Sequence, residues 1–206
     1  MVDFPLRYVH RPPDDPSSDA PAVLVLHGYG ADEHDLLASA ERLSDDRHVL
    51  SVRGPHAAGN GGYGWMASGA DPFAESVRLL ASFAELVPEA YDVAPDRIGA
   101  FGFSQGAKAA LAALVEHPDL VRWAVSLHGF LPRAYDDPDR LAAARDRSVF
   151  VGVGADDTVI SPEHGERTAE RLADAGLDVT FREYPVAHAV SPAAVADVAK
   201  WLGPRR

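Results

Sequence analysis

The chain of 206 residues contains no cysteine, which excludes disulfide bonds, thiolate metal sites and a cysteine nucleophile together. No apolar run approaches the roughly 20 residues that a membrane-spanning helix needs. The first 20 residues are charged and rich in proline, unlike a secretory signal. We therefore expect a cytoplasmic protein with one domain over residues 1–206, in which residues 1–20 form a flexible or edge segment.

Positive charge is also scarce. The chain has 19 lysines and arginines against 31 aspartates and glutamates, for a net charge of −12, and only Lys108 and Lys200 are lysines. Nucleic acid favours a basic surface, so we expect no nucleic-acid partner. An acidic, arginine-rich chain is typical of adaptation to high salt and also of a GC-rich genome, and the composition leaves both interpretations open.

Apolar runs alternate with amphipathic segments, which predicts an α/β fold with a mostly parallel central sheet and helices on both faces. The expected strands are residues 22–26, 48–52, 97–103, 123–127, 148–153 and 179–184. The expected helices are residues 35–43, 73–91, 105–116, 161–175 and 192–202. Pro88 predicts that the second of these helices ends or kinks near Val87. A glycine-rich loop over residues 54–71 is longer than a simple connection needs.

The pentapeptide Gly102-Phe103-Ser104-Gln105-Gly106 lies where an expected strand meets an expected helix. A sharp turn there would lift the Ser104 hydroxyl clear of the sheet, and the two glycines remove side chains that would collide. The following helix would present free N–H groups beside the serine, with the amide of Gln105 placed to bind an oxyanion. This context favours a nucleophile over a passive turn residue or helix cap.

A general base and an acid are expected further along the chain. Histidine suits proton transfer near neutral pH, and His188 follows the expected strand 179–184, at the same carboxyl edge of the sheet as Ser104. Asp156 and Asp157 follow the strand 148–153, so the order serine, aspartate, histidine is that of the α/β-hydrolases, with an ambiguity of one residue in the acid. The remaining histidines are interpreted as surface or structural residues: His10, His34, His48, His56, His117, His128 and His164.

The turn His27-Gly28-Tyr29-Gly30 follows the first long strand, and its amides could point at a ligand. A dinucleotide-binding loop is excluded because Glu33 stands where a third glycine is required. A metal site would draw on residues whose spacing matches no familiar site, namely His27, Asp32, Glu33, His34 and Asp35. We expect no metal and no cofactor, and a backbone role for the turn as the second source of oxyanion amides.

With these pieces in place, the sequence resembles the phospholipase/carboxylesterase family of α/β-hydrolases, which includes the acyl-protein thioesterases. The matching stretches are VLHGYGAD (25–32), GGYGWM (61–66), DRIGAFGFSQGAKAAL (96–111), SLHGFLP (126–132), GVGADDTVIS (152–161) and EYPVAHAVSP (183–192). The resemblance implies a single-domain α/β-hydrolase fold without a cap domain and a shallow, open acyl groove.

The resemblance also assigns roles to individual residues. It places the nucleophile on Ser104, the base on His188, the acid on Asp157 rather than Asp156, and the oxyanion amides on Tyr29 and Gln105. Trp65 would line the acyl site, and we place His27 and Gly28 at the substrate-binding surface with it. The chain departs from the family at His128, where many relatives have a small residue, and at Val186 and Ala187, which replace a glycine near the histidine.

The sequence thus predicts a serine carboxylesterase that acts on a small-molecule or lipid acyl ester as a monomer or homodimer. Thioesters and lysophospholipids are further candidate substrates. Two alternatives stay open: a non-catalytic ligand-binding module with this fold, and a hydrolase of another bond, such as a peptide, a lactone or a C–C bond.

Overall fold

The computed structural model describes residues 2–14, 20–43, 46–59, 61–67 and 72–203. Its main sheet has the strand order β1-β3-β2-β6-β7-β8-β9, and every neighbouring pair is parallel except β1 and β3. The strands are Tyr8–Arg11 (β1), Ala22–Leu26 (β2), His48–Val52 (β3), Ile98–Phe103 (β6), Trp123–Leu127 (β7), Ser148–Gly154 (β8) and Asp178–Tyr184 (β9). The predicted α/β fold with a mostly parallel sheet is therefore confirmed.

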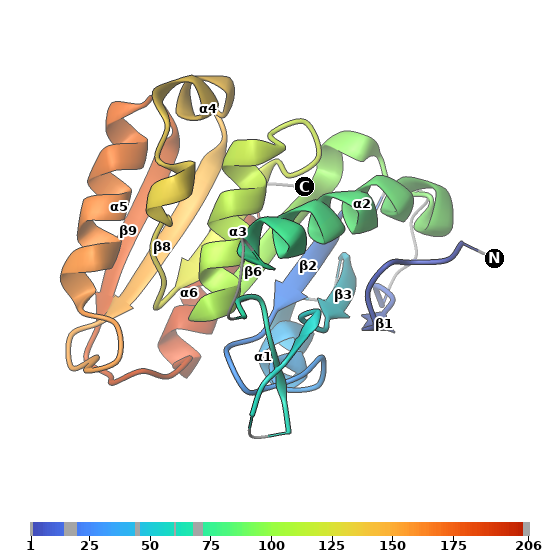
Figure 1. The fold of residues 1–206 in the computed structure, drawn as a ribbon, viewed down its shortest axis with the longest axis horizontal. Helices are drawn as coiled ribbons and strands as arrows, with labels where there is room; N and C mark the ends of the chain where they lie inside the picture. Colours follow the sequence, from blue (N-terminus) through green and yellow to red (C-terminus); the bar gives the residue numbers. More distant parts are fainter. Residues whose placement is uncertain (1, 15–19, 44–45, 60, 68–71, 204–206) are drawn as a thin grey trace.

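Helices cover both faces of the sheet (Figure 1). One face carries α2 (Pro72–Tyr91), α3 (Gln105–Glu116), α4 (Pro138–Ala143) and α5 (Pro162–Asp174). The other face carries α1 (Leu37–Ala40), a 3-10 turn (Glu41–Leu43) and α6 (Pro192–Leu202). Two further 3-10 turns span Pro95–Arg97 and Arg133–Tyr135.

Strand β2 shows why its sequence is apolar without interruption. Leu24 and Leu26 belong to the core under α2 and α3, whereas Val23 and Val25 belong to the core under α1 and α6. Side chains alternate between the two faces of a strand, and here both faces are buried. The sheet therefore lies between two hydrophobic cores, one on each of its faces.

The expected end of the second helix near Val87 is wrong, because α2 continues from Pro72 to Tyr91 with Pro88 inside it, and the kink that is the alternative stays a prediction. Only one turn follows the proline, and that turn is anchored from outside the helix. The Tyr91 hydroxyl forms a 2.7 Å hydrogen bond with the Tyr8 hydroxyl, and the Tyr91 ring packs 4.2 Å from the His10 ring, centroid to centroid. These tertiary contacts compensate for the backbone hydrogen bond that proline cannot donate.

Several short elements were not predicted. The strand β1 lies within residues 1–20, for which we expect a flexible or edge segment. Residues 8–11 form an edge strand that pairs with β3. The glycine-rich loop holds a hairpin of His56–Ala57 (β4) and Tyr63–Gly64 (β5), although its residues 60 and 68–71 lie outside the described residues. The helix expected at residues 35–43 is divided into α1 and a 3-10 turn, and α4 was missed.

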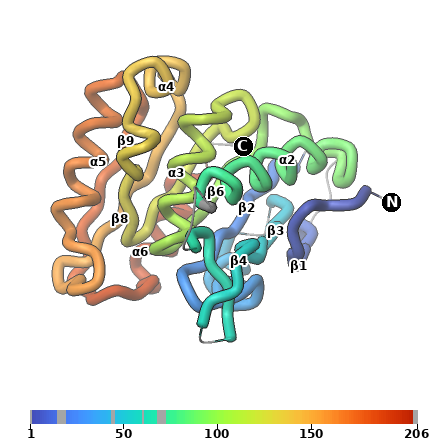
Figure 2. The backbone as a smooth tube through the Cα atoms, in the orientation of Figure 1, coloured from blue at the N-terminus to red at the C-terminus, as the bar shows by residue number. Residues whose placement is uncertain are grey.

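The topology brings loops from distant parts of the chain to one edge of the sheet. The carboxyl ends of parallel strands meet at the same edge, so the loops after β2, β6, β7, β8 and β9 lie together there. The β4–β5 hairpin adjoins the loop after β2 through the bridge between Ala31 and Tyr63 (Figure 2). None of the helices in the described part of the chain has the length and apolarity that crossing a bilayer requires.

Candidate active site

Ser104 occupies a strained turn between β6 and α3. Its φ is +54° and its ψ is −113°, a conformation that costs an L-residue free energy. The flanking glycines make the turn sterically feasible. A Cβ atom on Gly102 would lie 2.2 Å from the carbonyl oxygen of Gly106, and one on Gly106 would lie 2.0 Å from that of Leu26. The sequence therefore forms this turn only because both positions lack a side chain.

A continuous hydrogen-bonded chain starts at the serine. Oγ of Ser104 lies 2.9 Å from Nε2 of His188, and Nδ1 of His188 lies 2.7 Å from Oδ2 of Asp157. With its Nδ1–H donated to the carboxylate, a neutral His188 offers the lone pair of Nε2 to the serine hydroxyl. The structure thus brings together Ser104, His188 and Asp157, and it leaves Asp156 exposed with its amide bonded to the carbonyl of Val186.

The carboxylate of Asp157 is buried and accepts hydrogen bonds at both oxygens. Oδ1 accepts from the backbone N–H groups of Val159 and Ile160 at 2.8 and 2.9 Å. Burial alone would raise the pKa of Asp157, but the hydrogen bonds from His188, Ile160, His128 and Val159 outweigh burial and lower it to about 2. Asp157 is therefore ionised at neutral pH and stabilises a positive charge on the imidazole beside it.

The second imidazole on this carboxylate belongs to His128, which the sequence analysis interpreted as surface or structural. Its Nδ1 lies 2.8 Å from Oδ2 of Asp157, and the residue is 2% exposed. Burial lowers the pKa of His128 despite the neighbouring carboxylate. One signal in the sequence could have placed His128 near the site: it directly follows β7, at the same edge of the sheet as Ser104, although this position does not identify Asp157 as its partner.

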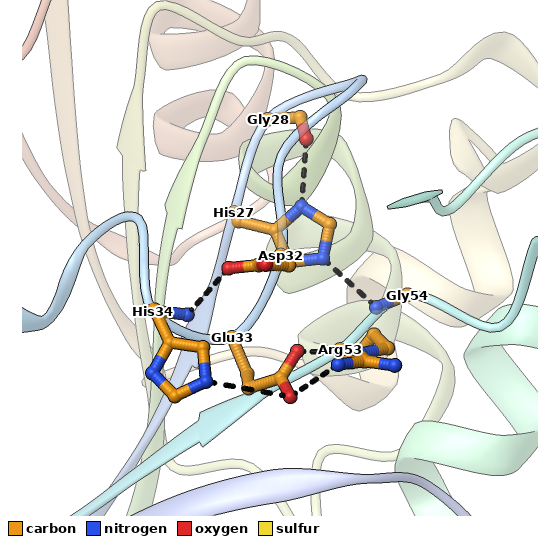
Figure 3. A network of polar contacts seen from close by, with 7 residues as sticks. All are labelled: His27, Gly28, Asp32, Glu33, His34, Arg53 and Gly54. Atoms are coloured by element: carbon orange, nitrogen blue, oxygen red, sulfur yellow. Dashed lines mark hydrogen bonds and ion pairs between the residues drawn. The ribbon is translucent and has the colours of Figure 1, made fainter. Parts of the chain in front are cut away.

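His27 does not present a free ring to a substrate in this structure (Figure 3). It is 1% exposed, its Nε2 accepts from the N–H of Gly54 at 3.0 Å, and its Nδ1 donates to the carbonyl of Gly28 at 2.7 Å. Burial lowers the pKa of His27, which favours the neutral ring that this pair of bonds requires. The carbonyl of Gly28 and the amide of Tyr29 belong to one peptide group, so His27 fixes the direction of that amide.

Gly28 itself lies against the nucleophile. A Cβ atom at this position would approach Cδ1 of Phe103 to 3.2 Å and Cβ of Ser104 to 3.6 Å. The next turn is tied to the hairpin, since Gly30 donates its N–H to the carbonyl of Tyr63 at 2.8 Å. The loop after β2 is thus held on two sides, and Tyr29 between them keeps a 60% exposed side chain.

The acidic residues after this turn are engaged with other groups (Figure 3). Glu33 is buried and forms an ion pair with Arg53, with Nη2 of Arg53 2.6 Å from Oε1 of Glu33. Burial opposes ionisation of Glu33, but the bonds and charge of Arg53 outweigh burial and lower the pKa of Glu33. Oδ1 of Asp32 accepts from the N–H of His34 at 2.9 Å. This arrangement braces the loop and gives no support to a metal site there.

Trp65 lies beneath the site rather than on its surface. It has no exposed area, its indole N–H donates to the carbonyl of His27 at 2.9 Å, and its backbone N–H donates to Oε1 of Gln105 at 2.7 Å. Its carbonyl accepts from the Ser76 hydroxyl at 2.8 Å. The contact of Trp65 with an acyl chain stays a prediction, and the bonds indicate a tie between the loop after β2 and the start of α3.

Within the described residues, one group of side chains has donor atoms spaced for a metal ion: His128, Asp157 and His188, whose ligand atoms lie within 4.8 Å of one another. Both histidines already direct Nδ1 at the same carboxylate oxygen. A metal ion there would have to displace both N–H protons and break the link from Asp157 through His188 to Ser104. The arrangement fits proton transfer better than metal binding.

The sheet, the strained serine turn and the hydrogen-bonded chain together define an α/β-hydrolase. A family model described as phospholipase/carboxylesterase matches residues 73–204, and the chain belongs to this family. The family and the enzyme class predicted from the sequence, that of ester-cleaving hydrolases, are thereby confirmed.

Individual relatives extend the likeness to most of the chain. Acyl-protein thioesterase 1 of Candida albicans is 27% identical over 220 residues, which cover 93% of this chain and 95% of that protein. Acyl-protein thioesterase 1 of Debaryomyces hansenii is 31% identical over 135 residues, covering 64% of this chain and 58% of that protein. The crystal structure of the Bacillus cereus carboxylesterase superposes with a TM-score of 0.84 at 25% identity, over 98% of this chain and 95% of that one.

Proposed function

We propose that this protein is a serine carboxylesterase that works through an acyl-enzyme. The observation that carries the proposal is the hydrogen-bonded chain Ser104–His188–Asp157, with heavy-atom distances of 2.9 and 2.7 Å. Oγ of Ser104 attacks the ester carbonyl carbon while its proton passes to Nε2 of His188. The same proton then passes to the leaving alcohol oxygen as the C–O bond breaks.

The second half-reaction repeats these transfers with water. A water molecule attacks the acyl carbon and gives a proton to Nε2 of His188, which returns it to Oγ of Ser104 as the acid leaves. Asp157 holds Nδ1–H of His188 throughout and stabilises the imidazolium that forms in each transition state. The lowered pKa of Asp157 keeps the carboxylate charged for this task.

The developing oxyanion would be bound by two backbone amides. Gln105 is the first residue of α3, so its N–H has no partner within the helix. This N–H lies at the N-terminal end of α3, where Ser104 precedes the helix. The amide of Tyr29 belongs to the peptide whose carbonyl His27 fixes. Removing one such donor typically costs about 10²- to 10³-fold in kcat.

Three exposed apolar side chains support an acyl substrate. Tyr29, Met66 and Val159 are 60%, 39% and 68% exposed, and they are the exposed large hydrophobic residues of the described part of the chain. Tyr29 lies in the loop after β2, and Val159 lies two residues after Asp157. An acyl chain of a carboxylic ester would cover such groups, and thioesters and lysophospholipids present the same kind of chain.

The test is kcat/KM across p-nitrophenyl esters of increasing acyl length, with a matched acyl thioester and with Ser104→Ala as the blank. The proposal expects hydrolysis that the variant lacks, with a loss of about 10⁴-fold or more in kcat. A fluorophosphonate probe should label the protein once and leave Ser104→Ala unlabelled. Hydrolysis that survives in Ser104→Ala would remove this serine from the mechanism.

A non-catalytic ligand-binding module with this fold is the alternative to an enzyme, and it predicts binding of an ester without turnover.

The proposal also includes a cytoplasmic location, a monomer or homodimer, and a single domain over the whole chain. Sedimentation of the purified protein at several concentrations would distinguish the two oligomeric states.

A further inference from the structure

His128 holds an unusual position for a buried histidine. It is the first residue after β7, is 2% exposed and has a φ of +54°, in the left-handed region. Its backbone N–H donates to the carbonyl of Gly152 in β8 at 2.8 Å, so this backbone remains tied to the sheet. A positive φ is unfavourable for a residue with a Cβ atom. In this conformation the imidazole of His128 contacts Asp157.

The two imidazoles share one oxygen atom. Nδ1 of His128 and Nδ1 of His188 lie 2.8 and 2.7 Å from Oδ2 of Asp157. The two rings are nearly perpendicular, at 83°, with centroids 5.5 Å apart, so each can aim an N–H at that oxygen without stacking on the other. The Asp157 side chain is only 1% exposed, so these two donors occupy Oδ2 with little access for water.

The charge state of His128 follows from its surroundings. The titratable groups that face it among the described residues are Asp157 and His188, and the ring also forms a hydrogen bond with the backbone of Ala189. Burial lowers the pKa of His128 and outweighs the hydrogen bonds with Asp157 and Ala189 and the charge of the carboxylate, all of which raise it, while the charge of His188 lowers it further. A neutral imidazole has a single N–H, and the hydrogen bond to the ionised Asp157 assigns it to Nδ1.

We propose that His128 is a positioning residue for the esterase reaction. It acts as a second imidazole that donates a hydrogen bond to Oδ2 of Asp157, so that the negative charge of this carboxylate is divided between His128 and His188. This inference rests on the proposed function, because the shared carboxylate matters only if His188 is the base. The inference also goes beyond the proposed function, because a catalytic triad requires one imidazole on its acid and this chain supplies two.

The sharing has a consequence for the pH range of activity. A carboxylate that also accepts from His128 stabilises the imidazolium of His188 less than a carboxylate with a single imidazole would. Removing the second donor should leave Oδ2 of Asp157 to His188 alone and strengthen that hydrogen bond, so the acid limb of the activity should move to higher pH.

Two substitutions at one position separate this role from packing. His128→Leu fills much of the same space and removes the donor. His128→Asn places an amide nitrogen on Cγ, where Nδ1 stands in histidine, and asparagine tolerates a positive φ better than most residues. His164→Leu is the matched control, because His164 is exposed and contacts the ring of Phe130 rather than Asp157.

The readout is the pH profile of kcat/KM on a neutral p-nitrophenyl ester. In His128→Leu the midpoint of the acid limb should rise by about 0.5–1 pH unit, and kcat on the plateau should fall by about 10-fold with KM little changed. His128→Asn should restore both, and His164→Leu should match the wild type. An acid limb in His128→Leu that coincides with the wild type would overturn the proposal, as would a shift in His128→Asn as large as in His128→Leu.

A second measurement needs neither activity nor a folded leucine variant. Nitrogen-15 NMR of the wild type should show a hydrogen-bonded Nδ1–H on the imidazoles of His27, His128 and His188, and His128→Asn should lose the one that belongs to His128. A wild-type His128 protonated only at Nε2 would overturn the proposal. Wild-type protein that hydrolyses no ester would instead refute the proposed function, and the NMR result would still decide whether His128 donates to Asp157.

Discussion

The indole N–H of Trp65 donates a 2.9 Å hydrogen bond to the backbone carbonyl of His27, at the end of β2. The backbone of Trp65 is bonded in turn to the side chain of Gln105, at the start of α3. One buried residue of the glycine-rich loop therefore links the two segments that would carry the oxyanion amides. Their relative position depends on a residue that the structure keeps away from solvent.

Trp65→Phe should lower kcat through this link. The substitution leaves the carbonyl of His27 buried without its donor, which costs about 1–3 kcal/mol of stability. It also loosens the spacing between the amides of Tyr29 and Gln105, so we expect kcat to fall by about 10-fold with KM little changed. Steady-state kinetics on one ester and urea unfolding would measure the two effects.

Trp123→Phe is the matched control for that experiment. Trp123 is 4% exposed, begins β7 at the opposite end of that strand from His128, and packs against Gly99 and Trp201. Both variants should lose stability, but only Trp65→Phe should lose kcat beyond the loss of folded protein. Equal kinetic losses in the two variants would reduce Trp65 to a packing residue.

His27→Leu should weaken the binding of the oxyanion. It removes the donor that fixes the carbonyl of Gly28, and with it the direction of the Tyr29 amide. Because the amide itself remains, we expect kcat to fall by about 10- to 100-fold, less than the roughly 10²- to 10³-fold cost of deleting a donor. His27→Asn keeps a nitrogen donor on Cγ and should lose less. Wild-type kcat in a folded His27→Leu would contradict this role.

The two adjacent acids should respond differently to the same change. Asp157→Asn keeps the shape of the side chain but removes the charge that stabilises imidazolium, so kcat should fall by about 10⁴-fold. Asp156→Asn should leave kcat within a factor of two, because Asp156 is exposed and engages Val186 through its backbone amide. The reverse result would move the acid by one position.

The serine turn was predictable because its causes are local. Two glycines around Ser104, an apolar strand before it and an amphipathic helix after it are all visible within twenty residues of sequence. The contacts of His128 and Trp65 were not predictable in this way. Each depends on partners distant in the sequence, Asp157 for His128, and His27 and Gln105 for Trp65. A buried imidazole or indole N–H needs an acceptor, but the residue type does not say which distant group supplies it.

The errors in the fold have the same origin. Pro88 has a strong local tendency to end a helix, but the bonded pair Tyr8 and Tyr91 holds the last turn of α2 in place. Strand β1 has no apolar run and forms only because β3 offers an unpaired edge for antiparallel pairing. Local propensity is a weak guide wherever a tertiary contact supplies the missing stabilisation.

The His10–His48 pair should make the stability of the fold depend on pH. Nε2 of His10 lies 3.0 Å from Nδ1 of His48, which joins β1 to β3 and requires at least one neutral ring. Burial lowers the pKa of both histidines below the unfolded value, and in His10 the charge of His48 lowers it further. The unfolded chain therefore binds more protons below about pH 6.5, so stability should be full above that pH and fall as the pH drops through and below it.

Urea unfolding of the wild type at pH 7.5 and pH 5.5 measures this loss, and the variant His10→Gln, His48→Gln isolates the share of the pair. The double variant should lose less stability between the two pH values, with a remainder from His27 and His128, whose pKa values are also lowered. Asp157 adds nothing in this window, because its pKa of about 2 makes its contribution fall only below about pH 4. His164→Gln should keep the wild-type difference, and a double variant as pH-sensitive as the wild type would show that the His10–His48 pair does not cause the pH dependence.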